Sequence, residues 1–145
     1  MTSKDTNELM HLLQEARTAA QLQTYTDTLA EQTNIQTFPE YLNSKMTEKD
    51  ISPAELIANA QIQRNYGYQI LSGTRKPSRD KILALCLALG LDLLETQRAL
   101  TLAQFGQLYS KNRRDSIFIF SINKKLSVLQ VNELLDEMKE ELLFN

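Results

Sequence analysis

Apolar side chains recur every three or four positions along most of the chain, which is the spacing of one face of an α-helix. The pattern is clear between Asp5 and Ala20 and between Arg79 and Leu89. It is weaker between Thr24 and Asn34, where several threonines lower the helical propensity. We therefore expect helices over residues 5–20, 24–34, 37–46, 53–60, 63–72, 79–89, 93–104, 113–123 and 127–142.

Polar residues mark where these helices begin and end. Ser52, Pro53 and Glu55 give the strongest start signal, because serine caps the helix and proline fits its first position without wasting a donor. Gly73 and Gly90 predict helix ends, since glycine adopts the left-handed cap conformation at little cost. The capping pattern of a small polar residue followed three positions later by Glu or Gln recurs at Thr37, Asp92 and Ser127.

One segment, Ser116 to Ile122, fits either a buried strand or a buried helix, because it is dense in β-branched and aromatic residues. No other segment of the chain is a strand candidate, and an isolated strand has no ladder partner. We therefore expect a helix from Arg113 to Asn123 and an all-α protein.

The composition is that of an ordinary globular chain. It has 145 residues, 42% of them hydrophobic, with only 4 Gly and 3 Pro. No apolar run approaches the roughly 20 residues of a membrane span, and residues 2–8 are too polar for a signal peptide. The single cysteine, Cys86, fits a reducing compartment. We expect a cytoplasmic protein with no membrane partner.

Side chains that carry catalysis or bind metals are scarce. The single histidine, His11, and Cys86 are far apart in the sequence, so no metal site or nucleophile–histidine pair is indicated. There is no glycine-rich phosphate loop. We expect no cofactor and no enzymatic activity.

Positive charge is concentrated in two places on a chain whose net charge is −2. Residues 61–81, the first basic cluster, carry +4, and residues 111–125, the second basic cluster, also carry +4, so the rest of the chain carries −10. Local rather than total charge steers a polyanion toward a protein. The alternative for the second cluster is a set of solvated helix ends, and we weigh the two equally.

The stretch from Ser52 to Pro77 predicts two short helices, the second rich in Gln, Arg, Asn and Tyr, followed by a basic turn. A DNA-binding helix-turn-helix has this organisation, with the second helix in the major groove. The segment from Phe38 to Ala103 resembles Cro/C1-type (XRE-family) helix-turn-helix regulators, whose fold is the phage-repressor-like five-helix domain. The resemblance rests on the run GTRKPSRDKILALCLALGLDLLE and on Leu56, Ala60, Ile62 and Ile70.

Several positions depart from the family pattern. Ile57 stands where the family usually has alanine, and Gly67 where it has a branched apolar residue. These two positions face each other in family members, so we expect Ile57 to fill the space that Gly67 leaves. Gln61 replaces the glycine of the tight turn and has to adopt the turn conformation. Leu71 also replaces a frequent glutamate.

The resemblance implies which residues meet DNA. The exposed face of the second helix would contact bases, and the following turn would contact phosphates. Tyr66 and Tyr68 cannot share one helix face, and we slightly favour Tyr66 as the inner one. The implied base contacts are Gln63, Arg64, Asn65, Tyr68 and Gln69, and the implied phosphate contacts are Thr74, Arg75, Lys76 and Arg79.

The flanking segments resemble Gram-positive bacterial XRE-type regulators that carry extra helices at both ends. We expect an N-terminal extension (1–36), the helix-turn-helix domain (37–104) and a C-terminal extension (105–145), packed as one domain. Asp115 follows Arg113 and Arg114, and an ion-paired structural corner is a better interpretation than a functional site.

The sequence thus predicts a transcriptional regulator with a repressor-like role that binds double-stranded DNA as a homodimer. A dimer is expected because one such domain covers only about one half-site. The added helices are candidate surfaces for dimerisation, for a protein partner or for an effector. The alternative is a protein-interaction adaptor on the same scaffold, in which DNA binding is weak or lost. The acidic total charge of the chain favours this alternative.

Overall fold

The computed structural model describes residues 10–11, 18–23 and 36–145. Every regular element in these ranges is a helix, so the all-α expectation is confirmed for them. The chain divides into two compact units, residues 1–36 and 37–145. The C-terminal helices therefore belong with the central ones as expected, whereas the N-terminal segment forms a separate unit. None of the described helices is long and apolar enough to cross a membrane.

In the first unit, a helix was expected from Asp5 to Ala20, but Thr18 is not helical, and most of the expected range lies outside the described residues. The Thr18 hydroxyl accepts a hydrogen bond from the backbone N–H of Gln21, and the Gln21 side-chain oxygen accepts one from the backbone N–H of Thr18, both at 3.1 Å. This reciprocal cap starts a helix, of which residues 19–23 are described. The helix expected over residues 24–34 lies outside the described residues.

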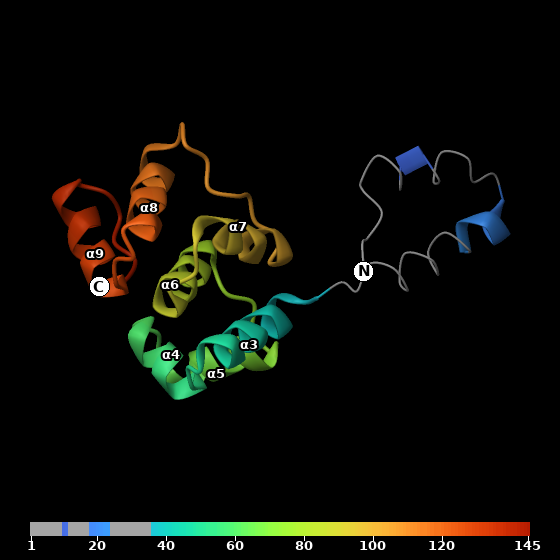
Figure 1. The fold of residues 1–145 in the computed structure, drawn as a ribbon, viewed down its shortest axis with the longest axis horizontal. Helices are drawn as coiled ribbons and strands as arrows, with labels where there is room; N and C mark the ends of the chain where they lie inside the picture. Colours follow the sequence, from blue (N-terminus) through green and yellow to red (C-terminus); the bar gives the residue numbers. More distant parts are fainter. Residues whose placement is uncertain (1–9, 12–17, 24–35) are drawn as a thin grey trace. The chain divides into compact units, whose positions relative to one another are not determined.

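The second unit consists of helices joined by connections of three to six residues, except for the longer connection at residues 103–112 (Figure 1). The predicted starts are confirmed, because the side chain of each capping residue accepts a hydrogen bond from the backbone N–H three positions later; these residues are Thr37, Ser52, Asp92 and Ser127. Gly73 and Gly90 end their helices in the left-handed conformation. The helices are α3 (Phe38–Lys49), α4 (Pro53–Asn59), α5 (Arg64–Ser72), α6 (Arg79–Leu89), α7 (Leu93–Leu102), α8 (Arg113–Asn123) and α9 (Val128–Glu137).

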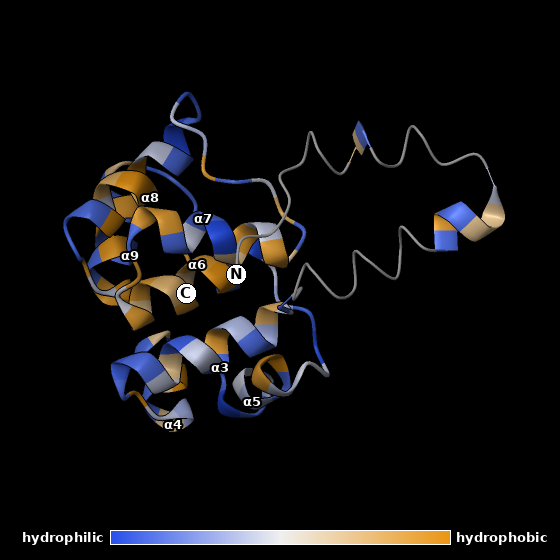
Figure 2. Cartoon of the chain, turned by 45° about the vertical axis from the view of Figure 1, so that its right-hand side comes forward, coloured by the Kyte–Doolittle hydropathy of each residue, from blue (hydrophilic) through white to orange (hydrophobic). Residues whose placement is uncertain are grey.

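Helix α6 is the centre of this unit. It is apolar around most of its circumference, and seven of its 11 residues are buried, as expected of a helix enclosed by others. It packs against α3 and α4, and also against α7 and α9. It therefore lies between the α3–α5 group and the C-terminal helices (Figures 1 and 2). One hydrophobic core therefore continues from α3 to the C-terminal residues.

The ambiguous segment at residues 116–122 is helical, and α8 has the predicted bounds. Phe118 and Ile122 are buried in the common core. The buried hydroxyl of Ser121 donates a hydrogen bond of 2.7 Å to the carbonyl of Ile117, so its burial leaves no polar group unsatisfied. Phe120, away from the buried side, is half exposed.

The last helix ends earlier than expected. We predicted a helix to residue 142, but α9 ends at Glu137, and Lys139 adopts a φ of 57° that turns the chain back. Asn132 then holds the returning chain, because its side chain accepts from the N–H of Leu143 at 2.7 Å and donates to the carbonyl of Phe144 at 3.0 Å. Met138, the first residue after α9, is 38% exposed.

Candidate nucleic-acid interface

A four-residue turn, residues 60–63, joins α4 to α5. Gln61 has a φ of 58°, the left-handed conformation that the sequence required of it in place of glycine. The next residue, Ile62, is buried and its N–H donates to the carbonyl of Ile57 at 3.2 Å. The turn is thus anchored in the core immediately before α5 begins.

The packing of α4 against α5 depends on the pair Ile57 and Gly67. Ile57 is 2% exposed, and a Cβ placed on Gly67 would lie 2.6 Å from its Cγ1 and 2.7 Å from its Cγ2. Atoms at that distance overlap, so no side chain fits at position 67 unless Ile57 moves. The expectation that Ile57 occupies the space beside Gly67 is therefore confirmed.

Helix α5 has one buried face and one exposed face. Gly67, Ile70 and Leu71 are buried, and Tyr66 is partly buried against the core. Tyr68 is 39% exposed, so the preference for Tyr66 as the inner tyrosine is confirmed. The exposed face carries the residues predicted to contact bases, namely Arg64, Asn65, Tyr68 and Gln69.

Gln63, also predicted to contact bases, has a structural role that its place in the sequence did not indicate. It is the N-cap of α5, and its side-chain oxygen accepts a hydrogen bond of 2.8 Å from the backbone N–H of Tyr66. A bidentate contact to adenine uses both the oxygen and the nitrogen of a glutamine amide. Gln63 therefore differs from Asn65 and Gln69, whose amides have no such capping role among the described contacts.

Two arginines lie over the two tyrosines of α5. The guanidinium carbon of Arg64 is 5.8 Å from the ring centre of Tyr68, and that of Arg75 is 4.8 Å from the ring centre of Tyr66. Such cation–π contacts orient the guanidinium groups without neutralising their charge. Within residues 36–145, neither arginine has a carboxylate at ion-pair distance, and neither does Lys76.

The loop after α5 displays Thr74, Arg75 and Lys76 at the surface. Its start is fixed by Gly73 at a φ of 84° and by the backbone N–H groups of Thr74 and Arg75, which both donate to the carbonyl of Gln69. The Thr74 hydroxyl lies 2.8 Å from that of Ser72. Pro77, which is buried, anchors the other end of the loop.

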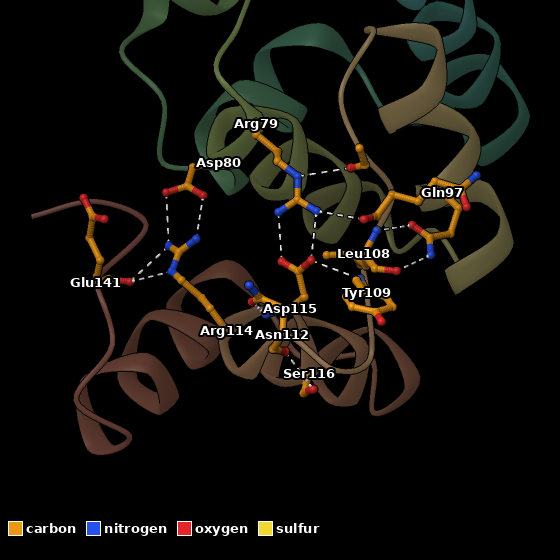
Figure 3. A network of polar contacts seen from close by, with 12 residues as sticks. Arg79, Asp80, Gln97, Leu108, Tyr109, Asn112, Arg114, Asp115, Ser116 and Glu141 are labelled. Atoms are coloured by element: carbon orange, nitrogen blue, oxygen red, sulfur yellow. Dashed lines mark hydrogen bonds and ion pairs between the residues drawn. The ribbon is translucent and has the colours of Figure 1, made fainter.

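Arg79 has a different role from the predicted phosphate contact. Its guanidinium makes a bidentate ion pair with Asp115, at 2.8 and 3.1 Å, and also donates to the carbonyls of Gly106 and Gln107, each at 3.2 Å (Figure 3). Its guanidinium donors are thus largely bonded within the chain. Because the structure gives these groups internal partners, we remove Arg79 from the candidate DNA contacts.

Asp115 is a structural residue, and its principal partner is Arg79, on α6. Burial by itself raises the pKa of Asp115, but hydrogen bonds from Arg79 and from the N–H of Tyr109, with the charges of Arg79 and Arg114, outweigh it. The pKa of this carboxyl group therefore lies below its ordinary value. The structural corner suggested by the sequence exists, with a partner 36 residues away that local sequence did not indicate.

Several basic side chains of the second basic cluster bind partners within the chain. Arg114 makes a bidentate ion pair with Asp80, at 2.8 and 3.1 Å, and Arg113 pairs with Glu140. Lys125 donates to the carbonyl of Gly90 at 3.0 Å. These contacts favour the structural interpretation of the cluster over the DNA-facing one. One feature of the sequence could have indicated these ion pairs: an Arg–Asp dipeptide occurs at both 79–80 and 114–115.

The described residues offer little for other chemistry. No group of three His, Cys, Asp or Glu side chains in the described ranges could hold a metal ion. Complete burial raises the pKa of the Cys86 thiol to about 12, so this cysteine is un-ionised at neutral pH and behaves as a small core residue.

No family model, no curated protein and no solved structure matches this chain. The geometry of residues 37–145 is therefore the basis for the proposed function.

Proposed function

We propose that this protein binds double-stranded DNA sequence-specifically and regulates transcription, with α5 in the major groove. The observation that carries the proposal is the exposed face of α5, where Arg64, Asn65 and Gln69 lie together beside the uncompensated Arg75 and Lys76. On a chain with a net charge of −2, this helix and the loop after it carry three positive charges that have no ion pair within residues 36–145.

The side-chain types on α5 suit base recognition. Asn and Gln can bond adenine through two hydrogen bonds, and Arg can bond guanine in the same way. With nine residues, α5 is about 13 Å long, and its diameter is comparable to the width of about 12 Å of the major groove. We assign the reading of bases to Arg64, Asn65, Tyr68 and Gln69, with Gln63 holding the start of the helix.

The charges next to α5 suit the DNA backbone. Arg75 and Lys76 lie on the loop directly after the helix, as phosphate-binding residues do when the helix occupies the groove. Thr74 adds a hydroxyl beside them. The contacts of Arg64 and Arg75 with tyrosine rings support this assignment, because they hold the guanidinium groups at the surface while leaving them charged.

The proposal includes the fold. Helices α3 to α7 would be a phage-repressor-like five-helix domain of the XRE type, with α4 and α5 as its helix-turn-helix. The left-handed Gln61 in the turn and the tight packing of Ile57 on Gly67 support this assignment. A homodimer would then provide two copies of α5 for two half-sites.

Selection from a random duplex pool, using the full chain, tests the proposal. We expect an enriched sequence motif, bound more tightly than random DNA. The Asn65→Ala and Gln69→Ala variants should each lose about 1–3 kcal/mol of discrimination at one or two base pairs. The matched control is Asn123→Ala, which removes from the end of α8 an exposed amide with no side-chain hydrogen bond among residues 36–145. No enriched motif, or variants with unchanged base preference, would contradict sequence-specific binding through α5.

The second candidate function, a protein-interaction adaptor, is favoured by a separate observation. Leu94 is 81% exposed on α7, beside a hollow of about 410 Å³ that Tyr41, Arg98 and Gln107 help to line. An apolar side chain so exposed is a candidate contact for another protein. The adaptor would show no salt-sensitive affinity for duplex DNA, which separates it from the first proposal.

A further inference from the structure

Two ion pairs cross between the first turn of α6 and the first turn of α8 in a reciprocal manner (Figure 3). Each helix supplies an Arg–Asp dipeptide: Arg79 of α6 pairs with Asp115 of α8, and Arg114 of α8 pairs with Asp80 of α6. Both pairs are bidentate, with N–O distances of 2.8 and 3.1 Å. We call these four residues the Arg–Asp exchange.

Each arginine also binds a backbone carbonyl outside the two helices. Arg79 bonds the carbonyls of Gly106 and Gln107 in the connection between α7 and α8, and Arg114 bonds the carbonyl of Glu141 in the C-terminal tail. The exchange thus ties both of these segments to the point where α6 begins. Asp115 is 6% exposed, so its carboxylate has little contact with water.

Arginine in the first turn of a helix is electrostatically unfavourable, because the N-terminus of a helix already has partial positive charge. Two helices whose first turns face each other and both contain arginine would repel. The two aspartates remove this repulsion and add charge-assisted, bidentate hydrogen bonds of fixed geometry. The arrangement therefore gives the contact between the two helix starts a defined geometry, set by the directions of these hydrogen bonds.

We infer that Arg114 and Asp115, although they lie on α8, are positioning residues for the loop between α5 and α6. The exchange fixes the first turn of α6, and Arg75 and Lys76 stand on the short loop that ends there. The loop is otherwise held at Gly73 by α5 and at Pro77 by burial. Only the identity of the loop as a DNA contact rests on the proposed function; its coupling to α8 does not.

Hydrogen–deuterium exchange of the full chain tests the coupling without DNA. The reporters are the N–H groups of Thr74 and Arg75, bonded to Gln69, and of Ile82, bonded to Ser78. In Asp115→Asn and in Arg114→Gln, we expect these amides to exchange about tenfold faster, because local opening becomes easier. Amides within α3 should keep their protection.

Two control variants separate this coupling from general destabilisation. Asp136→Asn removes an exposed carboxylate of α9 that has no ion pair among residues 36–145. Glu95→Gln breaks the ion pair of 2.8 Å between Glu95 and Lys45, which joins α7 to α3. Unchanged exchange at 73–82 in both α8 variants overturns the inference. Equal acceleration at 73–82 in Glu95→Gln overturns it too.

Duplex binding by the same variants then distinguishes the inference from the proposed function. If the loop opens and DNA affinity also falls, with a salt slope reduced by about one or two, both are supported. If the loop opens but the wild-type chain does not bind DNA, the coupling stands and the proposed function fails. If DNA binds and the loop is unaffected in the α8 variants, the proposed function stands and the inference fails.

Discussion

Gly67 is the residue on which the contact between α4 and α5 depends most directly. Gly to Ala in an open helix stabilises by about 1 kcal/mol. Here, Gly67→Ala should instead lower the free energy of unfolding by about 1–3 kcal/mol, because the added Cβ meets Ile57 at 2.6 Å. Urea denaturation followed by circular dichroism measures the change.

The double variant provides the control for this prediction. Ile57→Ala alone should cost about 2–5 kcal/mol, because it leaves a cavity beside Gly67. With Gly67→Ala in the same chain the clash is gone and the new methyl group occupies part of that cavity. The double variant should therefore lose at least about 1 kcal/mol less than the two single changes added together. Simple additivity would show that the two positions do not compensate.

Single residues were predictable from sequence where their partners are close in the chain. The left-handed Gln61 and the packing of Ile57 on Gly67 were expected from the helix-turn-helix pattern that this segment resembles. Arg79 was not predictable in this way. Its partner Asp115 is 36 residues away, so a basic residue after a candidate DNA-binding loop looked like a phosphate contact.

Among the helices, the start signals were the most reliable part of the sequence, because a cap involves residues only three positions apart. The start of α8 was predicted correctly. Its helical structure was also predicted correctly, because the sequence has no second strand candidate to pair with it. The end of α9 was not, because the turn at Lys139 is stabilised by Asn132 holding residues 143 and 144, a contact across 11 and 12 positions.

The link between α6 and α8 predicts a dependence of stability on pH. The pKa of Asp115 is lowered in the folded chain, so its contribution to stability is complete above the unfolded pKa of about 3.9 and is lost as the pH falls through the folded value. Asp115→Asn should cost about 2–3 kcal/mol at neutral pH, since it removes a charge from a largely buried pair.

Urea unfolding curves measured from neutral pH to about pH 3 check this expectation. The difference in unfolding free energy between wild type and Asp115→Asn should be constant near neutrality and should shrink as the solution becomes more acidic than about pH 4. Asp136→Asn, on the exposed side of α9, serves as the control and should show little change. A difference that grows on acidification would have the wrong sign for a lowered pKa.

At the scale of the whole molecule, the distribution of charge separates the two basic clusters. The total charge and the charges of the two clusters can be counted from the sequence. Whether each charged side chain forms an ion pair cannot. In the second cluster, Arg113 and Arg114 are ion-paired within the chain. In the first cluster, Arg64, Arg75 and Lys76 have no carboxylate at ion-pair distance in residues 36–145. Both arginines of the second cluster are thus neutralised within the chain, whereas these three residues of α5 and its loop keep an unpaired charge.

The salt dependence of duplex binding tests the central claim, that α5 and its loop bind DNA, most directly. The wild-type chain should bind with an affinity that falls steeply between about 50 and 200 mM salt, and Arg75→Ala with Lys76→Ala should weaken binding and reduce the slope by about two. Arg98→Ala with Lys111→Ala removes the same charge from exposed positions elsewhere and should leave the slope nearly unchanged. Absent or salt-insensitive binding, or equal effects of the two double variants, would contradict the claim.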